Sequence, residues 1–175
     1  MIDKRGKPCN PLTMRIELEK LVRMLDDELS VGSFQDVSNN GLQIANSGTV
    51  TRVLAGVDAS MSLLDEAARC GADCVICHHG LSWGDSLKRI TGLNHRLVSF
   101  AIRNNIAVYA AHLPLDAHPV YGNNAQICKA LGLLRPQPAF EYHGQKIGFM
   151  ANFKKPLPLT AFCGRVRKKV NADIK

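Results

Sequence analysis

The chain has 175 residues, 46% of them hydrophobic, six cysteines and a formal net charge of +7, which fits one globular core rather than two full domains. It has no run of about 18 apolar residues and no apolar stretch near its first residue, so we expect no membrane span, no signal peptide and a cytoplasmic protein. In that compartment the cysteines are expected to be reduced thiols, which argues against a disulfide framework.

The first part of the chain is predicted to be a lead-in followed by one covering helix. Residues 1–12 are polar, contain two prolines and are predicted to be disordered. Thr13 is expected to cap a helix with one buried stripe. The apolar residues of that stripe are Ile16, Leu18, Leu21, Val22, Leu25 and Leu29. Residues 31–48 are predicted to be a loop, in which Asp36 and the run 40–43 (N-G-L-Q) are polar groups close to tight turns.

Two alternating units follow and predict a parallel sheet. Residues 50–58 (V-T-R-V-L-A-G-V-D) form an expected strand, Ser60 caps a helix that Gly71 ends, and residues 74–77 form a strand buried on both faces. A strand, a helix and a strand within about 35 residues make a βαβ unit, whose crossover is right-handed.

The alternation continues with a loop, a helix and a third strand. The loop contains the single tryptophan, Trp83, and the cations Lys88 and Arg89, which either hold an anionic substrate or are solvated. Residues 95–104 are a predicted helix, and residues 106–111 (I-A-V-Y-A-A) are a predicted strand. The sequence therefore predicts an α/β fold with a mostly parallel sheet built from βαβ units.

The last part of the chain is predicted to contain two helices and one strand. Asn123 or Asn124 caps a helix that Gly132 closes. Residues 146–153 form an expected antiparallel strand after an H-G turn, and residues 159–170 form the last helix.

The net charge lies entirely in this last part. Up to Glu141 the chain has 14 Lys and Arg residues against 14 Asp and Glu, whereas the segment from Tyr142 onward has eight against Asp173 alone. Such a basic tail can attract the phosphates of a nucleic acid, but no aromatic residue lies between Arg165 and Lys169 to stack on bases. We therefore expect a solvated helix face or an interface for an acidic partner, and no nucleic-acid partner.

Polar side chains follow two neighbouring strands of the predicted sheet. His78 and His79 come directly after residues 74–77, and His112 and Asp116 follow the next strand. The carboxyl ends of parallel strands meet at one edge of the sheet, where ligands bind, so we expect these side chains to converge. The alternative is that the paired histidines are loop residues whose nitrogens bind backbone carbonyls.

Three imidazoles and a carboxylate suit Zn, Fe, Mn or Ni. Adjacent strand residues point to opposite faces, so His78 and His79 can share one ion only if the strand breaks, which Gly80 permits. Otherwise two ions would take one histidine each, with Asp116 bridging, and we favour this two-metal arrangement. Pro114 is expected to keep His112 and Asp116 off a helix.

A second motif overlaps this stretch. Cys74 to His78 has the pattern C-x-x-C-H, which occurs at c-type haem sites, and C-x-x-C occurs in zinc knuckles and redox pairs. Residues three apart in a strand face opposite sides, so the two sulfurs cannot reach one haem or one ion. We therefore interpret Cys74 and Cys77 as buried packing thiols. No phosphate-binding glycine loop and no G-x-S-x-G elbow occurs.

The chain resembles the Nif3-like family, whose bacterial members carry the name GTP cyclohydrolase I type 2 homologue. The resemblance rests on H-H-G after the buried strand and on A-A-H-L-P-L-D-A-H-P-V-Y-G-N-N-A-Q after the next. It extends to Asp36, to N-G-L-Q and to G-V-D-A-S at residues 56–60, and it covers about residues 13–134.

This resemblance implies a three-layer α/β fold with a dinuclear metal centre, assembled into hexameric toroids. Carried over residue by residue, it implies His78, His79 and Asp116 as metal ligands. His112 is implied as a further ligand, or as the catalytic residue that orients or donates to water bound by the metals.

The chain departs from the family at its other end. Family members run on to a second related half, in which a late H-x-x-x-E completes both metals. Here no histidine follows His143, and the last glutamate is Glu141. We therefore interpret residues 13–135 as a metal-binding lobe and residues 136–175 as the start of a second lobe, truncated so that the fold is incomplete at the C-terminus.

These observations favour a dinuclear metal-dependent hydrolase acting on a small-molecule substrate, either a nucleotide, as in a GTP cyclohydrolase, or a related phosphorylated molecule. Two divalent metal ions are the expected cofactors, and a homo-oligomer, a hexamer as in the relatives, is the expected assembly. Two alternatives are a non-catalytic metal-binding interaction protein and an inactive fragment.

Overall fold

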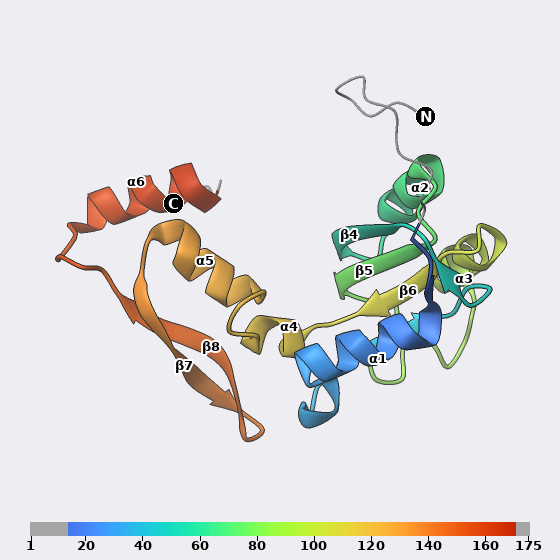
Figure 1. Ribbon diagram of the computed structural model, residues 1–175, viewed down its shortest axis with the longest axis horizontal. Coiled ribbons are helices and arrows are strands. Elements are labelled where there is room, and N and C mark those ends of the chain that lie inside the picture. Colours follow the sequence, from blue (N-terminus) through green and yellow to red (C-terminus); the bar gives the residue numbers. More distant parts are fainter. Residues whose placement is uncertain (1–13, 171–175) are drawn as a thin grey trace.

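A computed structural model describes residues 14–170 (Figure 1). An α/β part contains most of the first 110 residues, and a smaller part, made of the last helices and a hairpin, extends from it. The predicted lead-in at residues 1–12 and the predicted cap, Thr13, lie outside the described residues. No helix between residues 14 and 170 is long and apolar enough to cross a membrane.

The α/β part is built around a four-stranded sheet. Its strands lie in the order β2, β6, β5, β4, of which the last three are parallel and β2 runs antiparallel at one edge. Their bounds are β2 Gly41–Ile44, β4 Val53–Asp58, β5 Cys74–His79 and β6 Ala107–Ala110. The mostly parallel α/β fold predicted from the sequence is confirmed.

Helices cover both faces of this sheet and make three layers (Figure 1). Helix α1 (Leu18–Leu29) packs on one face, where Leu18 lies against Cys74 and Ala107. Helices α2 (Met61–Cys70) and α3 (Gly92–Arg103) pack on the other face. The core there is formed by Leu64, Ala67, Val75, Cys77, Leu97, Ala101, Val108 and Ala110. Burying each large aliphatic side chain in these clusters contributes about 1.5–3 kcal/mol.

The smaller part contains three helices and a hairpin. Helices α4 (Leu113–Ala117) and α5 (Asn123–Leu131) lead into strands β7 (Leu134–Tyr142) and β8 (Gln145–Asn152), and α6 (Leu159–Val170) follows. The two strands pair antiparallel, and a tight turn joins them. His143 and Gly144 both have positive φ, 46° and 79°, as a two-residue turn with the right twist requires.

Several predicted helix boundaries are confirmed. Ser60 caps α2 by accepting a hydrogen bond from the Leu63 amide, and Gly71 ends the helix in the left-handed conformation with a φ of 69°. Gly132 closes α5 in the same way. The cap of α5 is Gly122, not Asn123 or Asn124 as predicted, so the helix starts one or two residues earlier than expected.

The predicted start of the first helix is wrong. Residues 16 and 17 form a short strand, β1 (Ile16–Glu17), which pairs with β3 (Thr49–Val50), and α1 begins only at Leu18. The strand predicted at residues 50–58 is correspondingly divided into β3 and β4. At the break the amides of Thr51 and Arg52 donate to the Asp73 carboxylate instead of to a neighbouring strand.

Two other segments form strands that the sequence analysis did not predict. Three residues of the N-G-L-Q run, Gly41 to Gln43, belong to β2, because they pair with β6 at one edge of the sheet. Strand β7 contains Pro136 and Pro138, which argue against a strand in a sheet interior. A two-stranded ribbon has two free edges, so both prolines are tolerated there.

The prediction that Pro114 keeps Asp116 off a helix is wrong. Residues 113–117 form α4, in which His112 is the N-cap and Pro114 lies in the first turn. The first amides of a helix have no partner within the helix, so the missing N–H of a proline costs little at that position. Consequently Asp116 sits on the helix, and its amide donates to the carbonyl of His112.

Candidate metal centre

Three histidine rings gather at the carboxyl ends of β5 and β6. The ring centroids of His78 and His79 are 4.6 Å apart, and that of His112 lies 5.0 Å from the first and 5.6 Å from the second. One ring nitrogen of each residue lies within 4.8 Å of those of the other two, so the cluster could hold a metal ion. The predicted convergence of these side chains is confirmed.

The two strand histidines each have one ring nitrogen held by an acceptor. Nδ1 of His78 lies 3.0 Å from the carbonyl oxygen of Ala111, and Nδ1 of His79 lies 2.7 Å from Oδ1 of Asp58. A carbonyl oxygen and an ionised carboxylate both accept hydrogen bonds and cannot donate one. Nδ1 therefore carries the proton in both rings, and Nε2 is left as the nitrogen with a free lone pair.

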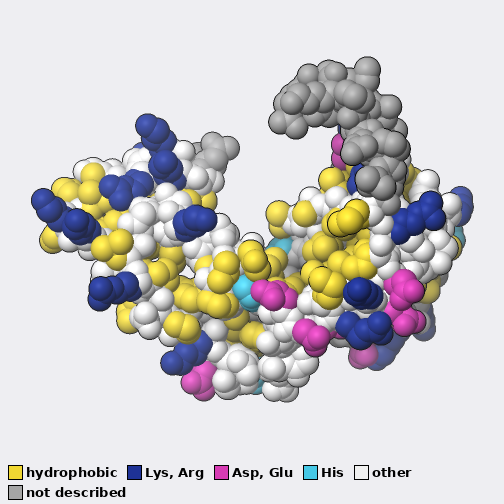
Figure 2. Space-filling view, viewed as in Figure 1, with side chains coloured by type: hydrophobic (Ala, Val, Ile, Leu, Met, Phe, Trp, Pro, Cys, Tyr) yellow, Lys and Arg dark blue, Asp and Glu magenta, His cyan; other side chains and the backbone are white. Residues whose placement is uncertain are grey.

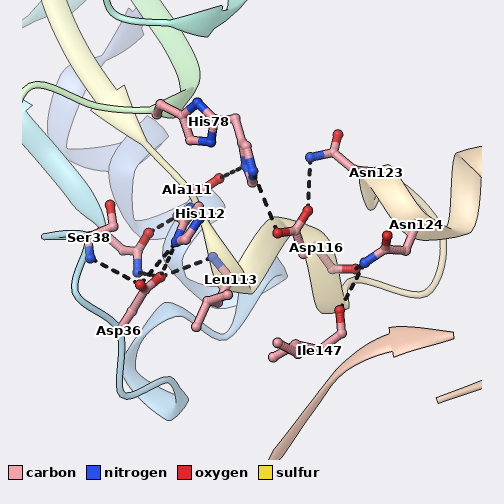
Figure 3. A network of polar contacts seen from close by, with 12 residues as sticks. Asp36, Ser38, His78, Ala111, His112, Leu113, Asp116, Asn123, Asn124 and Ile147 are labelled. Carbon is pink, nitrogen blue, oxygen red and sulfur yellow. Dashed lines mark hydrogen bonds and ion pairs between the residues drawn. The ribbon is translucent and has the colours of Figure 1, made fainter. Parts of the chain in front are cut away.

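His112 is held in the same way by a buried carboxylate. Its Nδ1 lies 3.0 Å from Oδ1 of Asp36, and Asp36 also accepts from the amides of Ser38 and Leu113 and from the side chain of Asn40 (Figure 3). Burial acts to raise the pKa of Asp36, but these hydrogen bonds lower the pKa below its ordinary value of 3.8. Asp36 is therefore ionised at neutral pH, and it orients His112.

Asp116 faces the cluster from α4. Its Oδ2 lies 3.6 Å from Nε2 of His78, while its Oδ1 accepts a hydrogen bond of 3.0 Å from Asn123 (Figure 3). Because Nδ1 of His78 donates to Ala111, a carboxylate oxygen and the lone pair of Nε2 face each other in the neutral ring, and this contact is favourable only with a proton or a cation between them. Asp116 thus converges with the histidines as predicted, and its role as a metal ligand stays a prediction.

The donor set fits a divalent transition metal. Imidazole nitrogens with an acceptor on the opposite ring nitrogen are the usual form of metal-ligating histidine, and a carboxylate is the usual companion. The carboxylates of Asp36, Asp58 and Asp116 also give the site a negative potential that attracts cations. These observations support metal binding by the cluster and leave the number and identity of ions as proposals.

The strand break that His78 and His79 would need in order to share one ion does not occur. Strand β5 continues through His79, which pairs with Asp58 of β4, yet the two rings are close together. Alternation determines the face from which each Cα–Cβ bond leaves the sheet, but long side chains also lean along the strand. At the end of a strand, the rings of two adjacent histidines can therefore lean past the edge of the sheet and lie close together.

The sequence did not predict that Asp58 and Asp36 would contact the cluster. Asp58 was quoted only as part of a motif, although it ends β4 in the same register as His79. The rule that placed His78 and His112 at one sheet edge also applies to the next parallel strand and could have found it. Asp36 stood out as polar, but its contact with His112 spans 76 residues, and no local pattern predicts it.

Gln43 fixes the start of the loop after β5, and Trp83 of that loop lies against the histidine rings. Oε1 of Gln43 accepts from the amides of Leu81 and Ser82, which fixes the start of the loop against β2. Trp83 donates from Nε1 to the carbonyl of Gly80, and its ring lies 5.0 Å from that of His112. Farther along the loop, Lys88 pairs with Asp85 at the surface.

The two strand cysteines are packing residues, as predicted. Cys74 lies in the cluster beneath α1, and Cys77 lies in the cluster beneath α2 and α3, so their sulfurs are on opposite faces of the sheet. Burial raises the pKa of Cys74 to about 11 and that of Cys77 to about 12. Both thiols are therefore protonated at neutral pH and are unsuited to bind a metal or to act as nucleophiles.

Known proteins are similar to this chain in sequence. The family described as Duf34/NIF3 (NGG1p interacting factor 3) matches residues 16–174. A "GTP cyclohydrolase 1 type 2 homolog" of Deinococcus radiodurans is 44% identical over 150 residues, which cover 86% of this chain and 57% of the relative. One of Archaeoglobus fulgidus, with the same name, is 48% identical over 141 residues, which cover 80% of this chain and 57% of the relative.

Solved structures share the fold. A structure titled "Structural genomics, protein ybgI, unknown function" has a TM-score of 0.82 and 33% identity over 89% of this chain and 61% of its own. That of TTHA1606 from Thermus thermophilus has a TM-score of 0.78 and 37% identity, and it covers 87% of this chain and 61% of its own. The chain spans less than two thirds of the length of these relatives. The chain belongs to the Duf34/NIF3 family.

Proposed function

We propose that this chain is the metal-binding part of a hydrolase that acts on a nucleotide or a related small phosphorylated molecule. The observation that carries the proposal is the cluster of three imidazoles, each held by an acceptor at Nδ1. The acceptors orient each ring and leave Nε2 as the ligand atom. The nucleotide part is supported by the relatives, which are named GTP cyclohydrolase 1 type 2 homolog.

We assign two divalent ions to this site, drawn from Fe, Zn, Mn or Ni. His78, His79 and Asp116 would hold them, with His112 as the third nitrogen of the cluster. Such ions, when bound, lower the pKa of coordinated water to about 7 and stabilise negative charge at the reacting centre.

The residues around the site have separate tasks in this proposal. Asn123 donates to Asp116 and thereby holds the carboxylate toward His78. Asp36 keeps the proton on Nδ1 of His112, so Nε2 of His112 either joins the ligand set or accepts a proton during the reaction. The ring of Trp83 packs edge-on against that of His112, with the two centroids 5.0 Å apart, and helps to hold the imidazole in place.

Turnover of GTP with added metal tests this function. The chain and a longer form are each loaded with Mn²⁺ or Zn²⁺, and product formation is followed with and without a chelator. We expect chelator-sensitive turnover that Asp116→Ala abolishes and His95→Ala leaves unchanged, because His95 is exposed on α3 and does not belong to the histidine cluster. Turnover that survives both the chelator and Asp116→Ala would contradict the proposal.

His112→Gln separates the two roles of His112. Loss of bound metal from this variant would identify His112 as a ligand. Full metal occupancy with turnover reduced at least about 100-fold would identify it as an acid or base, since general acid–base groups contribute about 10²–10⁴-fold.

A second candidate function is a metal-binding protein that docks on a partner without turnover. It is favoured by exposed apolar side chains on the hairpin, where Phe140 is 71% and Met150 is 65% exposed. Stoichiometric metal with no turnover of any nucleotide would support this candidate. An inert fragment, the third alternative, predicts no stoichiometric metal at all.

We also propose a homo-oligomer, with a hexamer as the expected form, located in the cytoplasm. The buried, protonated thiols of Cys74 and Cys77 are compatible with a reducing compartment.

A further inference from the structure

A cleft of about 550 Å³ borders the histidine cluster. It lies between the carboxyl end of the sheet and helices α5 and α6, and its volume falls within the roughly 300–1,000 Å³ of small-molecule sites. His78 lines it on one side, and Lys169 near the end of α6 lines it on another. A larger cleft of about 670 Å³ near His118 includes none of the three clustered histidines, so it is a poorer candidate for the substrate.

The walls of the cleft beside His78 are apolar. Val57 at the end of β4 and Ile127 on α5 are 63% and 42% exposed, although both are aliphatic. The amide of Gln126 and that of Asn123 supply the polar groups on the α5 side, and Asn123 also donates to Asp116. Asn123 thus lines the cleft and also contacts Asp116 beside the histidine cluster.

The charge of the cleft is positive at the α6 side. No acidic residue is among its lining residues, and Lys169 makes no ion pair with any residue between 14 and 170. Lys168 precedes it in the last turn of α6 but does not line the cleft. Figure 2 shows Lys and Arg side chains gathered over the smaller part of the molecule, with few acidic ones on this face.

We propose that this cleft binds the body of an anionic, phosphorylated substrate and that Lys169 pairs with its phosphate. The apolar body lies between Val57 and Ile127, and the reacting group reaches His78 and Asp116. This inference rests on the proposed function, because it places the reacting group at the metal centre. It makes Lys169 a residue that determines specificity rather than one that takes part in the chemistry.

Binding of GTP and guanosine to the chain, measured by titration calorimetry, tests the assignment. A phosphate paired with Lys169 forms a charge-assisted contact, so Lys169→Gln is expected to weaken GTP binding about tenfold. Guanosine, which has no phosphate, should bind the variant and the unchanged chain equally. Lys168→Gln is the matched control, because Lys168 lies on the same helix but does not line the cleft.

The titrations are made with and without Mn²⁺, and bound metal is counted separately. Equal GTP affinity in Lys169→Gln and in the unchanged chain would overturn the proposal, and so would the absence of GTP binding at full metal occupancy. Failure of the proposed function gives a different result: the histidine cluster would bind no metal, while GTP binding without metal would still depend on Lys169.

Discussion

The three imidazoles of the cluster are oriented by acceptors with very different surroundings. The side chain of Asp36 is 2% exposed and accepts four hydrogen bonds, so it links the histidine cluster to the fold. The side chain of Asp58 is 69% exposed and, among residues 14–170, forms a hydrogen bond only with His79. Loss of Asp58 should therefore affect the site without affecting the fold.

Asp58→Asn tests that separation. The amide no longer provides a charged acceptor for Nδ1 of His79, and removing such a partner weakens metal binding by about 10–100-fold. The free energy of unfolding should change by less than about 1 kcal/mol, because exposed ion pairs contribute little.

Calorimetric titration with Mn²⁺ and urea unfolding of the metal-free chain give the two quantities. Asp65→Asn, an exposed change on α2, is the control. Unchanged metal affinity in Asp58→Asn would show that Asp58 does not orient His79.

At the scale of the elements, β2 and β6 lie so close to Gly80, the residue after β5, that they leave no space for a side chain there. A Cβ atom there would lie 2.6 Å from the Cβ of Ala110 and would also overlap the amide of Gln43. Gln43 in turn holds the loop that starts at Leu81. The glycine after the paired histidines is thus required by close packing.

Gly80→Ala should accordingly lower the free energy of unfolding by about 1–3 kcal/mol, the usual cost of overpacking. Gly32→Ala is the matched control, because a Cβ at Gly32 has no atom within 4 Å and its φ is not positive. Urea unfolding monitored by the fluorescence of Trp83 measures both variants. Equal stability of the two would contradict the close packing described here.

The Asp73 carboxylate, which accepts hydrogen bonds at the break between β3 and β4, predicts that the stability of the fold depends on pH. Burial acts to raise the pKa of Asp73, but hydrogen bonds from Thr51 and Arg52 lower it below its ordinary value of 3.8. A carboxyl whose pKa is lower in the folded state stabilises the fold above its unfolded pKa, and that stabilisation is lost as the pH falls through the folded pKa.

Asp73→Asn should therefore be less stable than the unchanged chain at pH 7, and the difference should shrink below about pH 4. Urea unfolding at several pH values, with a chelator present, measures it. A difference that stays constant down to about pH 2 would show that the hydrogen bonds to Asp73 do not depend on its charge.

The sequence predicted those elements that local patterns define. Ser60 and Gly71 bound α2 because a cap and a left-handed residue act locally. The meeting of His78 with His112 followed from the topology of βαβ units. Strand β2 did not follow, because N-G-L-Q resembles a turn and becomes a strand only by pairing with β6. The hydrogen bond between Asp36 and His112 was not predicted either, because it also joins residues far apart in the sequence.

At the scale of the whole molecule, charge and shape divide the chain in two. The α/β part carries the histidine cluster and most acidic side chains, and the smaller part carries most of the basic excess (Figure 2). The cleft beside His78 lies where the two parts meet. A substrate with a negative charge would thus be attracted to the basic side of the cleft, and toward the histidine cluster only when cations are bound there.

Self-association belongs to this scale as well. If the chain assembles as the resemblance implies, light scattering after size exclusion should give a mass close to six times the 19.2 kDa of one chain. Phe140→Ser, at an apolar residue that is 71% exposed, should reduce that mass if the hairpin takes part in the contacts. A single species at 19.2 kDa over all concentrations would contradict the hexamer.

The most direct test of this account is the anomalous scattering of crystals of the chain soaked in Mn²⁺. We predict difference peaks about 2.0–2.3 Å from Nε2 of His78 and His79, with a carboxylate oxygen of Asp116 also in the coordination shell. A soaked crystal with no peak within bonding distance of these three side chains would contradict the metal centre, and with it the proposed chemistry.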